Sequence, residues 1–199
     1  MQISFEQPIS GFEFHISPIL DEHVKHLIKL AQHPQLPDLM GWDTYFEDND
    51  ITGFLDAISE YALSYSKPSQ PIVFGIYPAS YLLPVGYLVL KGFNQDERTA
   101  EIGIAILNQK FKGLGRFVSR LIIEYSFTQL QLHTLAATIL CSNKNSINMT
   151  KKLGFSTKEV LYKSWALPNG ELADMEWLEL NYTTWQQQMS RRYQVKVIT

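Results

Sequence analysis

One stretch, from Glu101 to Gly115, constrains this chain more than any other. An alternating apolar run predicts a strand, and the loop Asn108–Lys112 follows it. Two glycines, Gly113 and Gly115, then stand where a helix with apolar residues at a 3.6-residue period begins. The first amides of a helix lack internal partners and carry the positive end of its dipole, and glycine lets a ligand approach the backbone. The stretch therefore predicts a phosphate-binding strand–loop–helix unit.

Length and composition predict a single domain over residues 1–199, with a core over 12–182 and a C-terminal extension over 183–199. The formal net charge of −3 argues against a dedicated nucleic-acid binder. Cys141 is the single cysteine, so no disulfide can form within the chain and a reducing cytoplasmic location is expected. No apolar run approaches the roughly 20 residues that span a bilayer, and no metal motif occurs, so neither a membrane nor a metal is an expected partner.

The periodicities predict a mixed α/β (α+β) fold in the order β-α-α-β-β-β-α-β-α-β-β, with a mostly antiparallel sheet of about seven strands. The predicted strands are Phe12–Ser17, Ile72–Ile76, Pro84–Phe93, Thr99–Leu107, Thr134–Leu140, Thr157–Trp165 and Glu171–Leu180. The helices are expected from Pro18 to about Gln32, around Phe54–Tyr65, and over Gly113–Gln129, Asn143–Leu153 and Trp185–Arg191. His23 and His26 are expected on the surface of the first helix.

Two motifs stand within this framework. Residues Lys110–Gly115 read KFKGLG, and residues Asn143–Ser146 read NKNS, followed by Leu153–Phe155 as LGF. With the order of elements, these motifs resemble the GNAT superfamily of N-acetyltransferases, in the branch of ribosomal-protein N-terminal acetyltransferases and spermidine acetyltransferases. Lys110 departs from the Gln or Arg that the family has at that place. The resemblance is strong over Thr99–Phe155 and implies the GNAT fold, with helices on both faces of the sheet.

The resemblance also implies acetyl-CoA as cosubstrate. Its pantetheine would lie along the strand that ends at Leu107, where this strand diverges from Thr134–Leu140. The backbone amides from Lys112 to Arg116 would hold the pyrophosphate. The residues expected to bind the cosubstrate are Ile106, Leu107, Lys112, Gly113, Leu114, Gly115, Arg116, Asn143 and Ser146.

Direct acyl transfer to an amine needs a base, a donor for the oxyanion and, in some cases, an acid. By resemblance, Glu101 is the candidate base, with a surface carboxylate at a strand end as the alternative. A backbone N–H near Leu107 is the candidate oxyanion donor. Many family members place a Tyr where Thr150 stands, so Ser146 becomes the candidate acid. The alternative for Asn143 and Ser146 is a helix-capping role.

The acceptor is expected to enter between the first two helices and the last hairpin. Aromatic and acidic residues there suit a cationic amine: Trp42, Tyr45, Phe46, Glu47, Tyr162, Trp165 and Asp174. The sequence thus predicts an acetyl-CoA-dependent N-acetyltransferase that acts on a protein N-terminus or a small polyamine-like amine. The alternative is a catalytically silent member of the fold that binds coenzyme A as a sensor or interaction module. The alternating tail Tyr193–Val197 suits an extra strand or an arm to a partner subunit, so a homodimer is an expected assembly.

Overall fold

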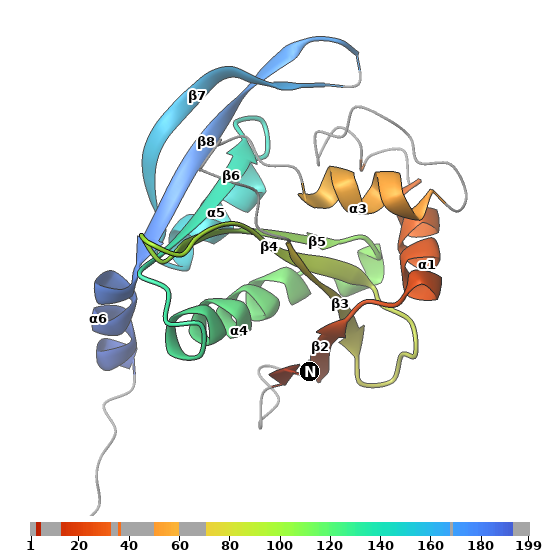
Figure 1. Cartoon of the computed structure of the whole chain (residues 1–199), viewed down its shortest axis with the longest axis horizontal. Coiled ribbons are helices and arrows are strands. Elements are labelled where there is room, and N and C mark those ends of the chain that lie inside the picture. The colour runs from red at the N-terminus through yellow and green to blue at the C-terminus, as the bar shows by residue number, and fades with distance from the viewer. Residues whose placement is uncertain are drawn as a thin grey trace, which may run out of the picture.

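The computed structural model describes residues 3–4, 13–32, 36, 50–59, 71–167 and 169–192. Its centre is an eight-stranded sheet in the order β1-β2-β3-β4-β5-β6-β8-β7 (Figure 1). The strands are β1 (Ile3–Ser4), β2 (Phe14–Pro18), β3 (Ile72–Pro78), β4 (Gly86–Asn94), β5 (Thr99–Ile106), β6 (Thr134–Leu140), β7 (Ser156–Ala166) and β8 (Leu172–Asn181). The helices are α1 (Asp21–Ala31), α3 (Ile51–Ser59), the 3₁₀ turn η1 (Gln109–Phe111), α4 (Leu114–Thr128), α5 (Lys144–Lys152) and α6 (Tyr182–Arg192).

All seven predicted strands are present in the predicted order, and their ends differ from the prediction by a few residues. Among the described strands, β5 and β6 form the one parallel pair, and all other neighbours are antiparallel. The eighth strand, β1, was not predicted, because two residues are too short for any periodicity to register. The predicted tail strand Tyr193–Val197 lies outside the described residues.

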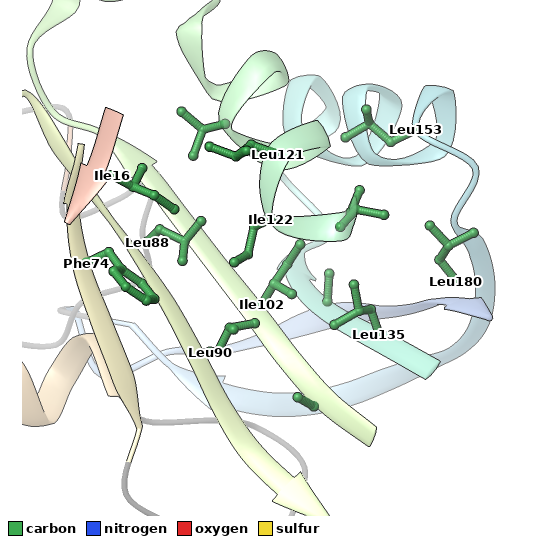
Figure 2. Close-up of a cluster of buried hydrophobic side chains, with 14 of the residues drawn as sticks. Ile16, Phe74, Leu88, Leu90, Ile102, Leu121, Ile122, Leu135, Leu153 and Leu180 are labelled. Atoms are coloured by element: carbon green, nitrogen blue, oxygen red, sulfur yellow. The ribbon is translucent and has the colours of Figure 1, made fainter. Parts of the chain in front are cut away.

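One face of the sheet is covered by α4, and we call it the α4 face (Figures 1 and 2). Alternate residues of the central strands point to this face and pack against the apolar stripe of the helix. Leu88, Ile102 and Leu135 come from three different strands, and Leu121 and Ile122 lie above them (Figure 2). This cluster fixes α4 against the strand that precedes it, so the N-terminus of α4 cannot shift relative to β5.

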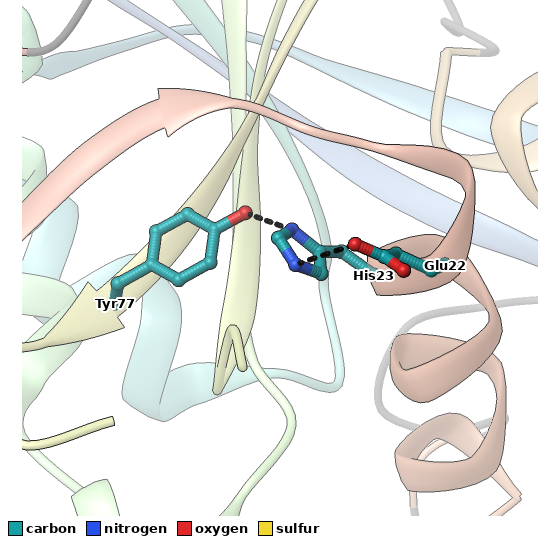
Figure 3. A network of polar contacts seen from close by, with 3 residues as sticks. All are labelled: Glu22, His23 and Tyr77. Atoms are coloured by element: carbon teal, nitrogen blue, oxygen red, sulfur yellow. Dashed lines mark hydrogen bonds and ion pairs between the residues drawn. The ribbon is translucent and has the colours of Figure 1, made fainter. Parts of the chain in front are cut away.

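The opposite face is covered by α1 and α3, and we call it the α1–α3 face. Tyr87, Ala105 and Leu107 point to it from β4 and β5. A polar contact also ties α1 to the sheet: the ring Nδ1 of His23 lies 2.8 Å from the hydroxyl of Tyr77 on β3 (Figure 3). The expectation that His23 is a plain surface residue was therefore wrong, because the partner strand lies 54 residues away in sequence.

Candidate active site

The sheet forks between β5 and β6. Three residue pairs join the two strands, and the last of them is Glu101 with Ala136. Both strands are described throughout and continue past this pair, to Ile106 and Leu140, without further pairing to each other. The fork leaves backbone groups of β5 without a strand partner on that side, which suits a ligand that carries its own amides.

The alternation of β5 decides which amides face the fork. The N–H of Leu107 donates to the carbonyl oxygen of Val85 at 2.9 Å, on the side of β4. Peptide groups alternate in direction along a strand, so the amides of Ile104 and Ile106 point toward β6 and the fork. Because Val85 already accepts the Leu107 hydrogen, the Ile106 amide is the N–H near Leu107 that faces the fork and stays the candidate oxyanion donor. The buried Leu107 side chain also packs on the α1–α3 face rather than on the α4 face.

A cavity of about 160 Å³ lies at the fork, and residues from both faces of the sheet line it. Its wall includes Ala57 and Ile58 of α3 on one face and Ser119 of α4 on the other. Residues from α5 and from the β7–β8 hairpin complete the wall. Two reactants could therefore approach one another through the sheet from opposite faces, which is the requirement for direct group transfer.

Glu101 lies at the closed end of the fork and is only 4% exposed. Its carboxylate oxygen Oε1 accepts a hydrogen bond from the Thr138 hydroxyl at 2.5 Å, across the gap between the strands. The same oxygen lies 3.7 Å from Nζ of Lys91, the cross-strand neighbour on β4. Burial raises the pKa of Glu101, and Lys91 and Thr138 oppose this shift only in part. The alternative of a surface carboxylate is thereby wrong, and the side chain is a buried proton acceptor that lines the cavity.

The start of α4 is the candidate anion cradle beside the fork. Gly113 caps the helix in the left-handed region, with φ of 100°. Lys112 donates its amide to Gln109 at 3.3 Å, and Arg116 donates to Gly113 at 3.3 Å. Of the amides predicted to bind pyrophosphate, those from Gly113 to Gly115 thus remain directed out of the helix end. The side chains of Lys112 and Arg116 are exposed, so their charges can reach a phosphate there.

Helix α5 presents one face to the cavity. Ser146, Met149, Thr150 and Leu153 repeat at helical spacing and line the wall. The side chain of Asn143 caps the helix by accepting the Ser146 amide at 3.1 Å. The capping alternative is thus correct for Asn143, although both residues also reach the cavity. Thr150, at the place where many family members have a Tyr, is 6% exposed and lines the cavity.

The acceptor residues predicted from aromatic content are brought together only in part. Trp165 lines the cavity, whereas Tyr162 is 77% exposed and is not part of the wall. Asp174 accepts the backbone N–H of Lys163 at 2.8 Å and so holds an irregular turn of β7. The other predicted acceptor residues, Trp42, Tyr45, Phe46 and Glu47, lie outside the described residues.

Three residues of the site were missed by sequence reasoning: Tyr87, Lys91 and Thr138. All three point to the α1–α3 face, and they reach Glu101 or the cavity from neighbouring strands. The available signal was the predicted hairpin between Pro84–Phe93 and Thr99–Leu107, which places a residue of the first strand opposite Glu101. Without the register, that residue could not be identified.

A forked sheet with a glycine-capped helix N-terminus beside the fork is the architecture of an acetyltransferase domain. The family model for the acetyltransferase (GNAT) domain matches residues 14–156. This match covers well over half of the chain, so the protein belongs to the GNAT acetyltransferase family. The predicted family, fold and enzyme class are thereby confirmed.

Solved structures share this fold. The spermidine N-acetyltransferase from Vibrio cholerae in complex with CoA and spermine aligns with a TM-score of 0.68 and 19% identity, over 87% of this chain and 98% of that one. A probable acetyltransferase aligns with a TM-score of 0.70 and 22% identity, over 91% of this chain and 99% of that one. A dodecameric form of the Vibrio cholerae enzyme aligns with a TM-score of 0.65 and 19% identity, over 90% of this chain and 98% of that one. No curated protein sequence matches this chain significantly.

Among the residues that the structure describes, no helix is long and apolar enough to cross a membrane. The same residues also contain no group of three or more His, Cys, Asp or Glu side chains placed to hold a metal ion.

Proposed function

We propose that this protein transfers an acetyl group from acetyl-CoA directly to a primary amine. The observation that carries the proposal is the position of Glu101, a buried carboxylate at the closed end of a cavity that is lined from both faces of the sheet. Acetyl-CoA supplies the activated acetyl thioester. The acceptor amine supplies the nucleophile from the α1–α3 face.

The residues on the α4 side fit the cosubstrate. The amides of Gly113 to Gly115 and the charges of Lys112 and Arg116 suit a pyrophosphate. The space around Gly113 supports this fit, because a Cβ placed there would meet no atom within 4 Å. The amides of Ile104 and Ile106 suit the carbonyl groups of the pantetheine arm and the acetyl oxygen.

Glu101 would act as the base, directly or through a water molecule. An amine in solution is protonated at neutral pH, and it must lose a proton before its lone pair can attack. A carboxylate whose pKa is raised by burial accepts that proton more readily than an exposed one. The new bond joins the amine nitrogen to the acetyl carbon, the carbon–sulfur bond breaks, and the coenzyme A sulfur leaves.

The leaving sulfur would take its proton from Ser146 or from water. Ser146 lines the cavity from α5 and is half-buried, so its hydroxyl can reach a ligand there. The protein's own cysteine is an unsuitable nucleophile for an acyl-enzyme. Burial raises the pKa of Cys141, aided by Asp174 and Glu176 and opposed by Lys144, so its thiol form is favoured.

A second candidate function is binding of coenzyme A without turnover. Thr150 supports it, because this buried residue of the cavity wall offers no phenol to protonate the leaving sulfur. A thiol-release assay with acetyl-CoA and a panel of peptides, polyamines and aminoglycosides tests the two together. Release of thiol that depends on an amine supports the transferase. Coenzyme A binding in calorimetry without release on any amine supports the second candidate, and no binding at all refutes both.

A further inference from the structure

The wall of the cavity on the α1–α3 face carries a buried positive charge. Lys91 is 9% exposed, and it belongs to the same wall as Glu101, Tyr87 and Gly103. These four positions lie on one face of the sheet, because paired residues of neighbouring strands point the same way. An acceptor that approaches Glu101 from α3 therefore also approaches an ammonium group.

The charge of this wall is balanced. Among the described residues that line the cavity, Lys91 is the one basic residue and Glu101 is the one acidic residue. The two lie opposite one another on β4 and β5. Nζ of Lys91 lies 3.7 Å from Oε1 of Glu101. One carboxylate that already faces one ammonium leaves no net negative charge for a polycationic ligand.

The remainder of the wall on this side combines apolar groups with uncharged polar ones, among them the Thr138 hydroxyl that is bonded to Glu101. Ala57 and Ile58 come from α3, and Trp165 comes from β7. The ring of Tyr87 packs edge-on against Phe54, with centroids 5.8 Å apart. These groups suit an uncharged chain or ring beside the reacting amine, and they offer no carboxylate to a second ammonium.

We propose that Lys91 is a specificity-determining residue that excludes polyamines and selects an acceptor with a single amine beside an uncharged, apolar group. The inference rests on the proposed function and concerns its acceptor. Each additional ammonium of a polyamine would lose water beside a carboxylate that Lys91 already neutralises, and no uncompensated negative charge among the described wall residues would offset that cost. The single reacting amine passes its proton to Glu101 and attacks in its neutral form.

The test compares two acceptors, phenethylamine with one amine and spermidine with several, by steady-state thiol release. For the wild-type protein we expect kcat/KM for phenethylamine to exceed that for spermidine by about 10-fold or more. The variant K91M should reduce this ratio by about 10-fold. The ratio is the readout, because removal of Lys91 also changes the pKa of Glu101, and this effect is common to both acceptors. The matched control is K158M, which removes one exposed positive charge of β7 outside the cavity wall and should leave the ratio unchanged.

A wild-type preference for spermidine would overturn the inference, and this result can be obtained even if K91M does not fold. A ratio that is equal in wild type and K91M would also overturn it. If K158M reduced the ratio of the two kcat/KM values as much as K91M does, the inference would be overturned too, because the effect would then come from overall charge. Failure of every amine, with acetyl-CoA still bound, would instead overturn the proposed function and the inference that rests on it.

Discussion

Replacement of Glu101 by glutamine separates catalysis from stability at this site. The side chain keeps its shape and can still accept the Thr138 hydrogen bond, but Lys91 loses its opposite charge. At 3.7 Å and an effective dielectric constant of about 20, Coulomb's law gives an attraction of about 4.5 kcal/mol within that pair. Burial nevertheless raises the pKa of Glu101, so the folded protein favours the neutral side chain at this position, and we expect E101Q to unfold at a urea concentration no lower than that of the wild type.

The double variant K91M/E101Q removes both charges and should also remain stably folded. Replacement of a buried ion pair by groups of similar volume is often neutral or stabilising, by about 1–4 kcal/mol. Its activity should nevertheless fall by about 10²–10⁴-fold, because the general base is absent. Urea unfolding and thiol release measure the two properties independently. Wild-type turnover by a stable K91M/E101Q protein would refute Glu101 as the base.

The pH dependence of the wild-type protein follows from the same carboxyl group. Burial raises the pKa of Glu101, and the base form is lost as pH falls through this raised value. The acid limb of kcat/KM should therefore begin at higher pH than for an ordinary glutamate, and E101Q should lack it. For stability the sign is opposite: the contribution of Glu101 is fully present below its unfolded pKa and is lost as pH rises through the folded pKa.

Four further predictions concern three glycines and the α1 contact. G113A should lower stability by about 1–2 kcal/mol in urea unfolding, because φ is 100° there. G115A should fold normally, since its Cβ would make an ordinary 3.6 Å contact, yet bind acetyl-CoA more weakly in calorimetry; unchanged affinity would contradict the cradle. G86A should fail to accumulate as folded protein, because its Cβ would lie 2.1 Å from a backbone oxygen of β5. Y77F should cost about 1 kcal/mol through loss of the bond to His23, and no loss would show that this bond is dispensable.

The fold was predictable because its signals are local. The alternation in Thr99–Leu107, the helical period after Gly113 and the turn at Asn169–Gly170 each depend on residues close in sequence. That β6 lies beside β5 and diverges from it followed only from the resemblance to the family, and their parallel pairing was not predicted. The strand β1 was missed for the opposite reason, since its two residues gain their structure from the neighbouring β2.

The site was less predictable, because its chemistry depends on register between strands. The position of Glu101 on the strand was evident, but its burial depends on Lys91 and Thr138, which lie 10 and 37 residues away. The choice of oxyanion donor near Leu107 depends on register in the same way. Which amides face the fork depends on whether odd or even residues bond to β4, and a shift of one residue reverses the answer.

The fork also divides the sheet mechanically. The three strands β6, β8 and β7 are joined to the other five by only three residue pairs. Amide hydrogens at Ile104 and Ile106, which lack a partner strand on the fork side, should exchange rapidly with deuterated water although they lie in the middle of a sheet. A cosubstrate bound in the fork would slow their exchange and connect the two parts of the sheet, so occupancy could be followed residue by residue without any catalytic turnover.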